Sequence, residues 1–382
     1  MRVRALEALG RERLAVAALA AGAWSVWTHR IGISDLDDAA SNEVLFAREP
    51  LATILFDLKW ADQSPLYFVV LHFWRAFGES PAWIKSLNLI AVTLAVVLLY
   101  EVARLVADSR PVALGAVALA VLSPAMLWVV RNGRMYSLQL LLFVACMYGL
   151  LDYARRRRRR GLALFVVAAL LSIYNHFVGF AAVGTALLWL ALEERAHAAT
   201  PAGQAEGGPS TLRWLRVPVA TGLAILLLVL PQVWRAVHLL GEAPRLIAGW
   251  SLPPSRVGFL DHLTWFWFVN SDWGGLRDWG PALRPVYLIS ASLLFVAGLS
   301  DPTGRVTRAG LATVVLPVVA GYLAAIGHAD LRHRYFVHLL PMIWIVVASG
   351  ALAGGGAAAT GPSRAWTRGR RAMLVVVGLG SG

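Results

Sequence analysis

Charge and cysteine are both scarce in this sequence. Only 15% of its 382 residues are charged, and Cys146 is its single cysteine. One cysteine excludes an intrachain disulfide framework, and since Cys146 lies inside an apolar run we expect it to be a small core residue. The basic residues form short patches between apolar runs, so the net charge of +13 does not indicate nucleic-acid binding.

Apolar residues make up 58% of the chain, and the mean hydropathy is +0.63. Several runs approach the 20 or so residues that span a bilayer, and such segments must be helical to satisfy their backbone. We therefore expect an all-α polytopic membrane protein with about ten or eleven transmembrane helices, forming a single domain over residues 1–382. Four arginines before residue 14 and six in a row at 155–160 predict a cytoplasmic N-terminus.

The predicted spans follow the apolar runs. The first run lacks a convincing signal-peptide cleavage site, so we interpret it as a retained helix. Residues 373–382 are too few to cross, so we expect either a partial helix or a chain that continues. The expected spans are 14–27, 83–105, 112–130, 135–153, two short helices in 162–192 with an outer turn at 174–176, 215–233, 286–299, 311–326 and 336–352.

The segment 31–67 stands out as an acidic loop on the outer side, with seven of the chain's 22 acidic residues. Ser34-Asp35-Leu36-Asp37 resembles a capping box, and the apolar spacing after it predicts an amphipathic helix on the outer membrane surface. Residues 64–78 are apolar but short for a span, which favours a partial helix beside the site.

A second outer loop, 234–284, holds six of the 16 tryptophans. Tryptophan favours the membrane interface, where its ring is apolar and its N–H stays wet. Interfacial anchoring and a platform for sugar rings or an isoprenoid chain are both compatible with this loop.

Several basic residues fall at outer helix ends, where the positive-inside tendency works against them. Arg131 and Arg134 are expected to share a helical face at i and i+3, and His176 lies in another outer turn. Contact with lipid headgroups explains each alone, but as a set they favour a site for an anionic lipid phosphate beside a carboxylate. The set is completed by Arg332 and Arg334.

The chain also resembles bacterial GT-C membrane glycosyltransferases, the relatives of protein O-mannosyltransferases and lipid A aminoarabinose transferases. Five motifs in matching order carry this resemblance: Asp37-Asp38; Ser64-Pro65-Leu66-Tyr67-Phe68 with Leu71-His72-Phe73-Trp74; Ser123-Pro124 with Arg131-Asn132-Gly133-Arg134-Met135-Tyr136-Ser137-Leu138; Tyr174-Asn175-His176-Phe177; and Arg334-Tyr335 with Leu340-Pro341.

The resemblance implies a GT-C bundle with its site at the outer face of the inner membrane. It implies inverting sugar transfer from a polyprenyl-phosphate donor to a lipid, glycan or protein acceptor, with Asp37 or Asp38 as general base. The substrate-binding positions that it implies are Arg131, Arg134, Tyr136, His176, Arg332, Arg334 and Tyr335.

Two departures from the family pattern bear on the site. An Asp-Glu pair is replaced by Asp37-Asp38, and a glutamate of the third motif is replaced by Asn132, for which Asp35, Glu43 or Asp62 is a candidate substitute. Asp37 also fits the third position of the capping box, a purely structural role.

Three further questions stay open at this level. Asp37, Asp38 and Asp62 offer oxygen ligands for a divalent cation, but no spacing rule supports a metal site. A transporter or lipid flippase is the alternative from another class, which the absence of mid-membrane carboxylates and repeats disfavours. A non-catalytic binder of lipid-linked sugar is the third reading, motivated by Asn132.

Overall fold

The computed structural model describes residues 2–29, 31, 36, 38–56, 64–201, 212–235, 237, 280–319, 337–352 and 372–373. In 2–11, 13, 38–39, 124 and 280–288 the description covers the backbone alone. The described part of the chain is helical and contains no β-strand, which confirms the predicted all-α class.

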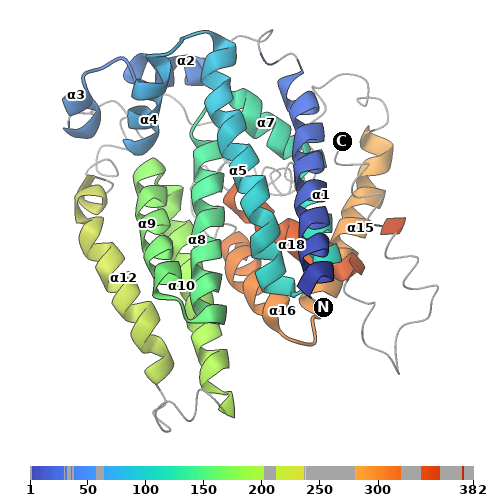
Figure 1. Ribbon diagram of the computed structural model, residues 1–382. Coiled ribbons are helices and arrows are strands. Elements are labelled where there is room, and N and C mark those ends of the chain that lie inside the picture. Colours follow the sequence, from blue (N-terminus) through green and yellow to red (C-terminus); the bar gives the residue numbers. More distant parts are fainter. Residues whose placement is uncertain are drawn as a thin grey trace.

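Long helices run side by side through the molecule (Figure 1). The central pair is α5 (Pro81–Ala107) and α8 (Tyr136–Arg156), which pack against each other, and α8 also packs against α9 (Arg159–Asn175). The other long elements are α1 (Arg2–Thr28), α6 (Arg110–Leu122), α10 (Val178–Ala198), α12 (Arg216–Leu228), α15 (Gly280–Leu299) and α18 (Leu340–Leu352).

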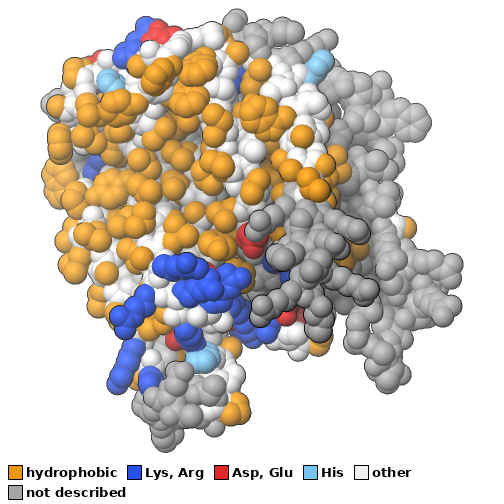
Figure 2. Space-filling model, viewed as in Figure 1, with side chains coloured by type: hydrophobic (Ala, Val, Ile, Leu, Met, Phe, Trp, Pro, Cys, Tyr) orange, Lys and Arg blue, Asp and Glu red, His pale blue; other side chains and the backbone are white. Residues whose placement is uncertain are grey.

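Two described helices, α5 and α8, are long and apolar enough to cross a membrane by themselves. α6 and α7 (Pro124–Asn132) are long and apolar enough only when they are taken together across a bend, and shorter apolar helices occur in 14–28, 289–299 and 337–352. Figure 2 shows a broad hydrophobic surface above a dense patch of Lys and Arg side chains. The polytopic membrane fold is thus confirmed, whereas the total of ten or eleven spans stays a prediction.

The expected single helix over 112–130 is wrong. The structure divides it into α6 and α7, which meet at an angle of 54°. Ser123 adopts an extended backbone conformation, and Pro124 opens α7. Proline removes a backbone donor and disfavours a helical conformation in the residue before it, so the chain bends at this point.

The helices of the bundle approach one another closely at glycines. A Cβ atom on Gly149 of α8 would lie 2.6 Å from the backbone N of Phe165 on α9, and one on Gly179 of α10 would lie 2.4 Å from the carbonyl oxygen of Ser172. Small residues let membrane helices pack backbone to backbone. Cys146 of α8 is a buried core residue, as predicted.

One end of the bundle carries the short helices α2 (Asp38–Phe46), α3 (Leu51–Phe56) and α4 (Leu66–Arg75), and we name it the first-loop end (Figure 1). The predicted apolar face of α2 is confirmed, since Ala40, Val44 and Ala47 are buried. The expected cap at Ser34 and Asp37 lies outside the described residues.

Two tryptophans join α4 to the start of α5. The rings of Trp74 and Trp83 stack with centroids 5.0 Å apart, and each indole N–H donates to the backbone carbonyl of the other residue. The predicted partial helix over 64–78 therefore exists and is fixed at a defined angle to α5.

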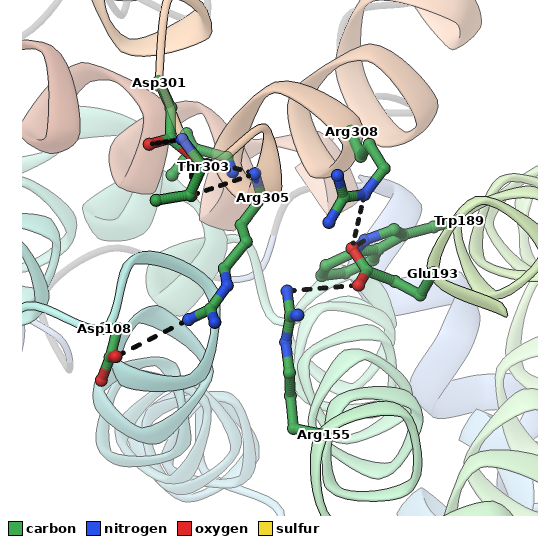
Figure 3. A network of polar contacts seen from close by, with 9 residues as sticks. Asp108, Arg155, Trp189, Glu193, Asp301, Thr303, Arg305 and Arg308 are labelled. Carbon is green, nitrogen blue, oxygen red and sulfur yellow. Dashed lines mark hydrogen bonds and ion pairs between the residues drawn. The ribbon is translucent and has the colours of Figure 1, made fainter. Parts of the chain in front are cut away.

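The opposite end, which we name the arginine end, carries the arginines at 155–160 and α16 (Arg305–Gly310). Figure 3 shows Glu193 of α10 between Arg155 and Arg308, each with a nitrogen 3.2 Å from the carboxylate. The Asp152 carboxylate forms an ion pair with Nη1 of Arg156 at 3.0 Å, and nitrogens of two further arginines lie within 4 Å of it. Glu193 thus joins α8, α10 and α16, and Asp152 joins α8 to the start of α9.

Candidate functional site

The residues predicted for the site divide into two groups. Arg131, Arg134, Tyr136 and His176 are described, and the structure places all four at the first-loop end, around the start of α8 and the turn between α9 and α10. Asp38 is described as the first backbone position of α2. The others lie outside the described residues: Asp35, Asp37, Asp62, Arg332, Arg334, Tyr335 and the tryptophan-rich segment 238–279.

Arg134 reaches across to the acidic loop. Its Nε lies 2.6 Å from Oε1 of Glu43 on α2, and both residues are buried, with 6% and 1% of their surfaces exposed. The pair joins segments 91 residues apart. A buried ion pair of this kind is costly to break, because either partner alone would be an uncompensated charge.

Hydrogen bonds from buried side chains of α4 and α5 fix the backbone of the turn that carries Arg134. Gly133 ends α7 with φ +72°, a left-handed conformation that glycine adopts without strain. The Tyr67 hydroxyl donates to the carbonyl of Gly133 at 2.7 Å, and the Asn88 amide donates to the carbonyls of Val129 and Arg134. Burial, and then the Glu43 carboxylate, raise the pKa of the Tyr67 phenol well above its ordinary value, so it remains a donor at physiological pH.

Two rings, those of Tyr136 and His176, lie one after the other beside the Arg134 guanidinium. The Arg134 guanidinium lies over the Tyr136 ring at 5.4 Å, and the Tyr136 ring lies 5.9 Å from that of His176. Nδ1 of His176 accepts the backbone N–H of Val178, the first residue of α10. The predicted turn after residue 174 is therefore confirmed, whereas its place on the outer side stays a prediction. The His176 ring satisfies one backbone N–H at the start of α10.

The expectation that Arg131 and Arg134 share a helical face is wrong. Gly133 terminates α7 between them, so Arg131 lies in α7 and Arg134 lies in the bend before α8. Arg131 instead donates from Nη2 to the carbonyl of His29, beyond the end of α1, at 2.5 Å. The two side chains serve different neighbours.

Lys85 is a charged residue at this end that the sequence reasoning missed. It lies in the second turn of α5, is 1% exposed, and its Nζ is 3.5 Å from the carbonyl of Ile31 in the acidic loop. The signal was available, since an ionisable residue inside an apolar span is costly and marks a functional site by default.

Three carboxylates were candidates to replace the family glutamate that is absent at Asn132, and the structure describes one of them. Of Asp35, Glu43 and Asp62, only Glu43 is described, and its partner Arg134 follows Asn132 by two residues. Within the described residues no group of three metal-ligating side chains occurs. The Asp37, Asp38 and Asp62 set that offers cation ligands lies outside them, at least in its side chains.

The helical bundle, capped at one end by short helices, has the fold that the sequence resemblance predicted, since solved structures of that architecture align with nearly all of the chain. Among solved structures, it is similar to ArnT from Cupriavidus metallidurans in the apo state, with a TM-score of 0.59 and 14% identity over 96% of this chain and 74% of that one.

Two further structures share the fold. The same ArnT bound to undecaprenyl phosphate aligns with a TM-score of 0.58 and 13% identity, covering 96% of this chain and 75% of that chain. The Archaeoglobus fulgidus oligosaccharyltransferase in the apo form aligns with a TM-score of 0.50 and 12% identity, over 97% of this chain and 56% of that chain. No protein-family model and no curated protein matches the sequence.

Proposed function

We propose that this chain transfers a sugar from a polyprenyl-phosphate donor to a hydroxyl acceptor at the outer face of the inner membrane. The observation that carries the proposal is the fold, which the chain shares with an ArnT structure that contains undecaprenyl phosphate. The buried charges at the first-loop end support it, since an active site for a charged lipid needs ionisable groups at membrane depth.

The orientation follows from the arginines. The residues at 155–160 and the pairs around Glu193 and Asp152 gather at the end opposite α2, and cytoplasmic loops are rich in Lys and Arg. We therefore assign the arginine end and the N-terminus to the cytoplasm and the first-loop end to the outer side. The chain acts as a single domain within the lipid bilayer.

The reaction is a displacement at the anomeric carbon. Asp37 or Asp38 removes the proton of the acceptor hydroxyl, whose oxygen forms a bond to that carbon while the bond to the phosphate oxygen breaks. The electron pair leaves with the polyprenyl phosphate, and one displacement inverts the configuration. The backbone of Asp38 begins α2 at the first-loop end, which supports it as a candidate for this role.

Positive charge must compensate the departing phosphate. Lys85 is the described candidate, because its ammonium group is buried directly beneath the acidic loop. Arg131, His176, Arg332 and Arg334 are further candidates from the sequence, with Tyr136 and Tyr335 as neighbouring hydrogen-bonding groups. A divalent cation held by Asp37, Asp38 and Asp62 would also compensate the negative charge of the departing phosphate. Arg134 is set apart by its pairing with Glu43.

The test is transfer by the purified full chain from a panel of polyprenyl-phosphate sugars to lipid, glycan and peptide acceptors. We expect transfer with at least one pair, and its loss in Asp37→Asn combined with Asp38→Asn. Asp108→Asn is the matched control, because Asp108 is exposed at the arginine end. Donor binding without transfer would instead indicate a non-catalytic binder, and lipid flux across proteoliposomes in the double variant would indicate a transporter.

A further inference from the structure

We propose that Arg134 is a positioning residue for the acidic loop, acting through Glu43, and is not a ligand of the donor phosphate. Its partner lies on α2, the helix that begins at Asp38. The inference rests on the proposed function for its kinetic consequence, whereas its structural part can be tested without any transfer reaction.

The guanidinium of Arg134 is enclosed on two sides. Its Nε points at the Glu43 carboxylate at 2.6 Å, and its Cζ lies 5.4 Å from the centre of the Tyr136 ring. Both members of the ion pair are buried. A phosphate would therefore have to displace a buried carboxylate to take the Nε donor, and that displacement would leave Glu43 uncompensated.

The backbone of Arg134 is a fixed base for this contact. Asn88 of α5 donates to the carbonyls on both sides of the turn, Val129 at 3.2 Å and Arg134 at 3.1 Å, and Tyr67 of α4 donates to Gly133. These buried bonds join three elements at one point. The side chain of Arg134 thus projects from a rigid part of the bundle.

The acidic loop meets the same turn from the other side. A Cβ atom on Gly133 would lie 3.2 Å from Cδ2 of Leu36 and 3.6 Å from Cβ of Ala40, so the loop packs directly over the glycine. At the other end of α2, the carbonyl of Ala47 accepts hydrogen bonds from the side chains of His72 and Arg75.

Taken together, α2 is tied to α4 at its C-terminal end and to Arg134 at its middle, five residues after Asp38. Loss of the ion pair would remove a buried polar link between the middle of α2 and the turn before α8. Because catalytic groups need placement within a fraction of an ångström, the pair would control the carboxylates at 37 and 38.

The experiment compares Glu43→Gln, Arg134→Gln and the double variant in the purified full chain. Positioning predicts that all three lose kcat to the same extent, roughly 100-fold, because each removes the same contact. It also predicts that binding of undecaprenyl phosphate, measured by titration, stays within about twofold of wild type. Hydrogen exchange in residues 38–47 should rise in all three.

Two further variants complete the design. Arg134→Lys keeps the charge and should recover part of the lost kcat, which keeps the test valid if the neutral variants fold poorly. Arg48→Gln removes an exposed arginine just after α2, one paired with Glu79, and should behave as wild type.

The proposal is overturned if Arg134→Gln weakens undecaprenyl phosphate binding tenfold or more while Glu43→Gln does not, since that pattern defines a phosphate ligand. Unchanged exchange in 38–47 would overturn it as well. Absence of transfer by the wild-type protein with every donor would count against the proposed function alone, because the exchange and binding measurements would still decide the role of Arg134.

Discussion

Gln232 donates a hydrogen bond of 2.7 Å from its Nε2 to the Oγ of Ser64, and both side chains are buried. The two residues are 168 positions apart. This contact ties the chain just after α12 to the chain just before α4. The described residues Gln232 to Arg235, which lead into the tryptophan-rich segment, therefore lie at the first-loop end, the same end as the acidic loop.

Lys85→Gln should weaken binding of undecaprenyl phosphate by roughly 10- to 100-fold, since a hydrogen bond to a charged group contributes about 1.5–3 kcal/mol. Lys85→Arg should keep part of the affinity. The measurement is a binding titration in detergent, with Arg110→Gln as control, because Arg110 pairs with Glu12 far from the acidic loop. Equal affinity in Lys85→Gln and wild type would remove Lys85 from the phosphate site.

Gly179→Ala should lower the stability of the bundle by about 1–3 kcal/mol. The added Cβ would lie 2.4 Å from the carbonyl oxygen of Ser172, a backbone atom that no side-chain rotation can move. Gly184 on the same helix has nothing within 4 Å, so Gly184→Ala should be neutral or stabilising by up to about 1 kcal/mol. Thermal unfolding of both variants in detergent measures the difference, which a flexible α9–α10 contact would abolish.

Glu193→Gln should cost about 2–3 kcal/mol, because it removes the carboxylate shared by Arg155 and Arg308 in the buried junction of three helices (Figure 3). The partial exposure of both arginines keeps the loss below that of a fully buried pair. Asp108→Asn is the control and should cost less than about 1 kcal/mol, since Asp108 is exposed. Chemical denaturation of the purified variants checks both values.

Glu79 should give a small acid-dependent contribution to stability. Hydrogen bonds from Arg75 and then Arg48 lower the pKa of its carboxyl from the ordinary value of 4.5. A lowered pKa in the folded state means that the stabilisation is complete above the ordinary pKa and disappears as the pH falls through the lowered one. The difference in melting temperature between wild type and Glu79→Gln should therefore be constant near neutral pH and vanish in acid. A difference that grows in acid would contradict this assignment.

The sequence was sufficient for features that depend on local pattern. Asn175 and His176 interrupt a long apolar run, and the α9–α10 turn lies at that point. The Ser123-Pro124 pair carried a signal for a break, yet proline is tolerated in membrane helices, so the length of the run favoured one span. Gly133 between Arg131 and Arg134 was a similar signal, since only a continuous helix would put them on one face.

Long-range polar contacts could not be predicted from the sequence. No spacing rule connects Glu43 with Arg134 or Tyr67 with Gly133, because each pair meets only when separate helices pack. Lys85 differs, since its charge within an apolar span was visible. The resemblance to GT-C proteins supplied the order of motifs at the site. The substrate role that it implies for Arg134 stays a prediction, and the pairing of Arg134 with Glu43 was not visible in the motifs.

The Glu193 junction also bears on the order of biosynthesis. Arg155 and Glu193 belong to α8 and α10, whereas Arg308 is translated more than a hundred residues after Glu193. Until α16 arrives, this carboxylate has one arginine and lacks its second cross-link. The nascent protein therefore passes through a stage in which α8 and α10 are inserted but incompletely fastened, and a ribosome that stalls before residue 305 would release a product prone to quality-control degradation.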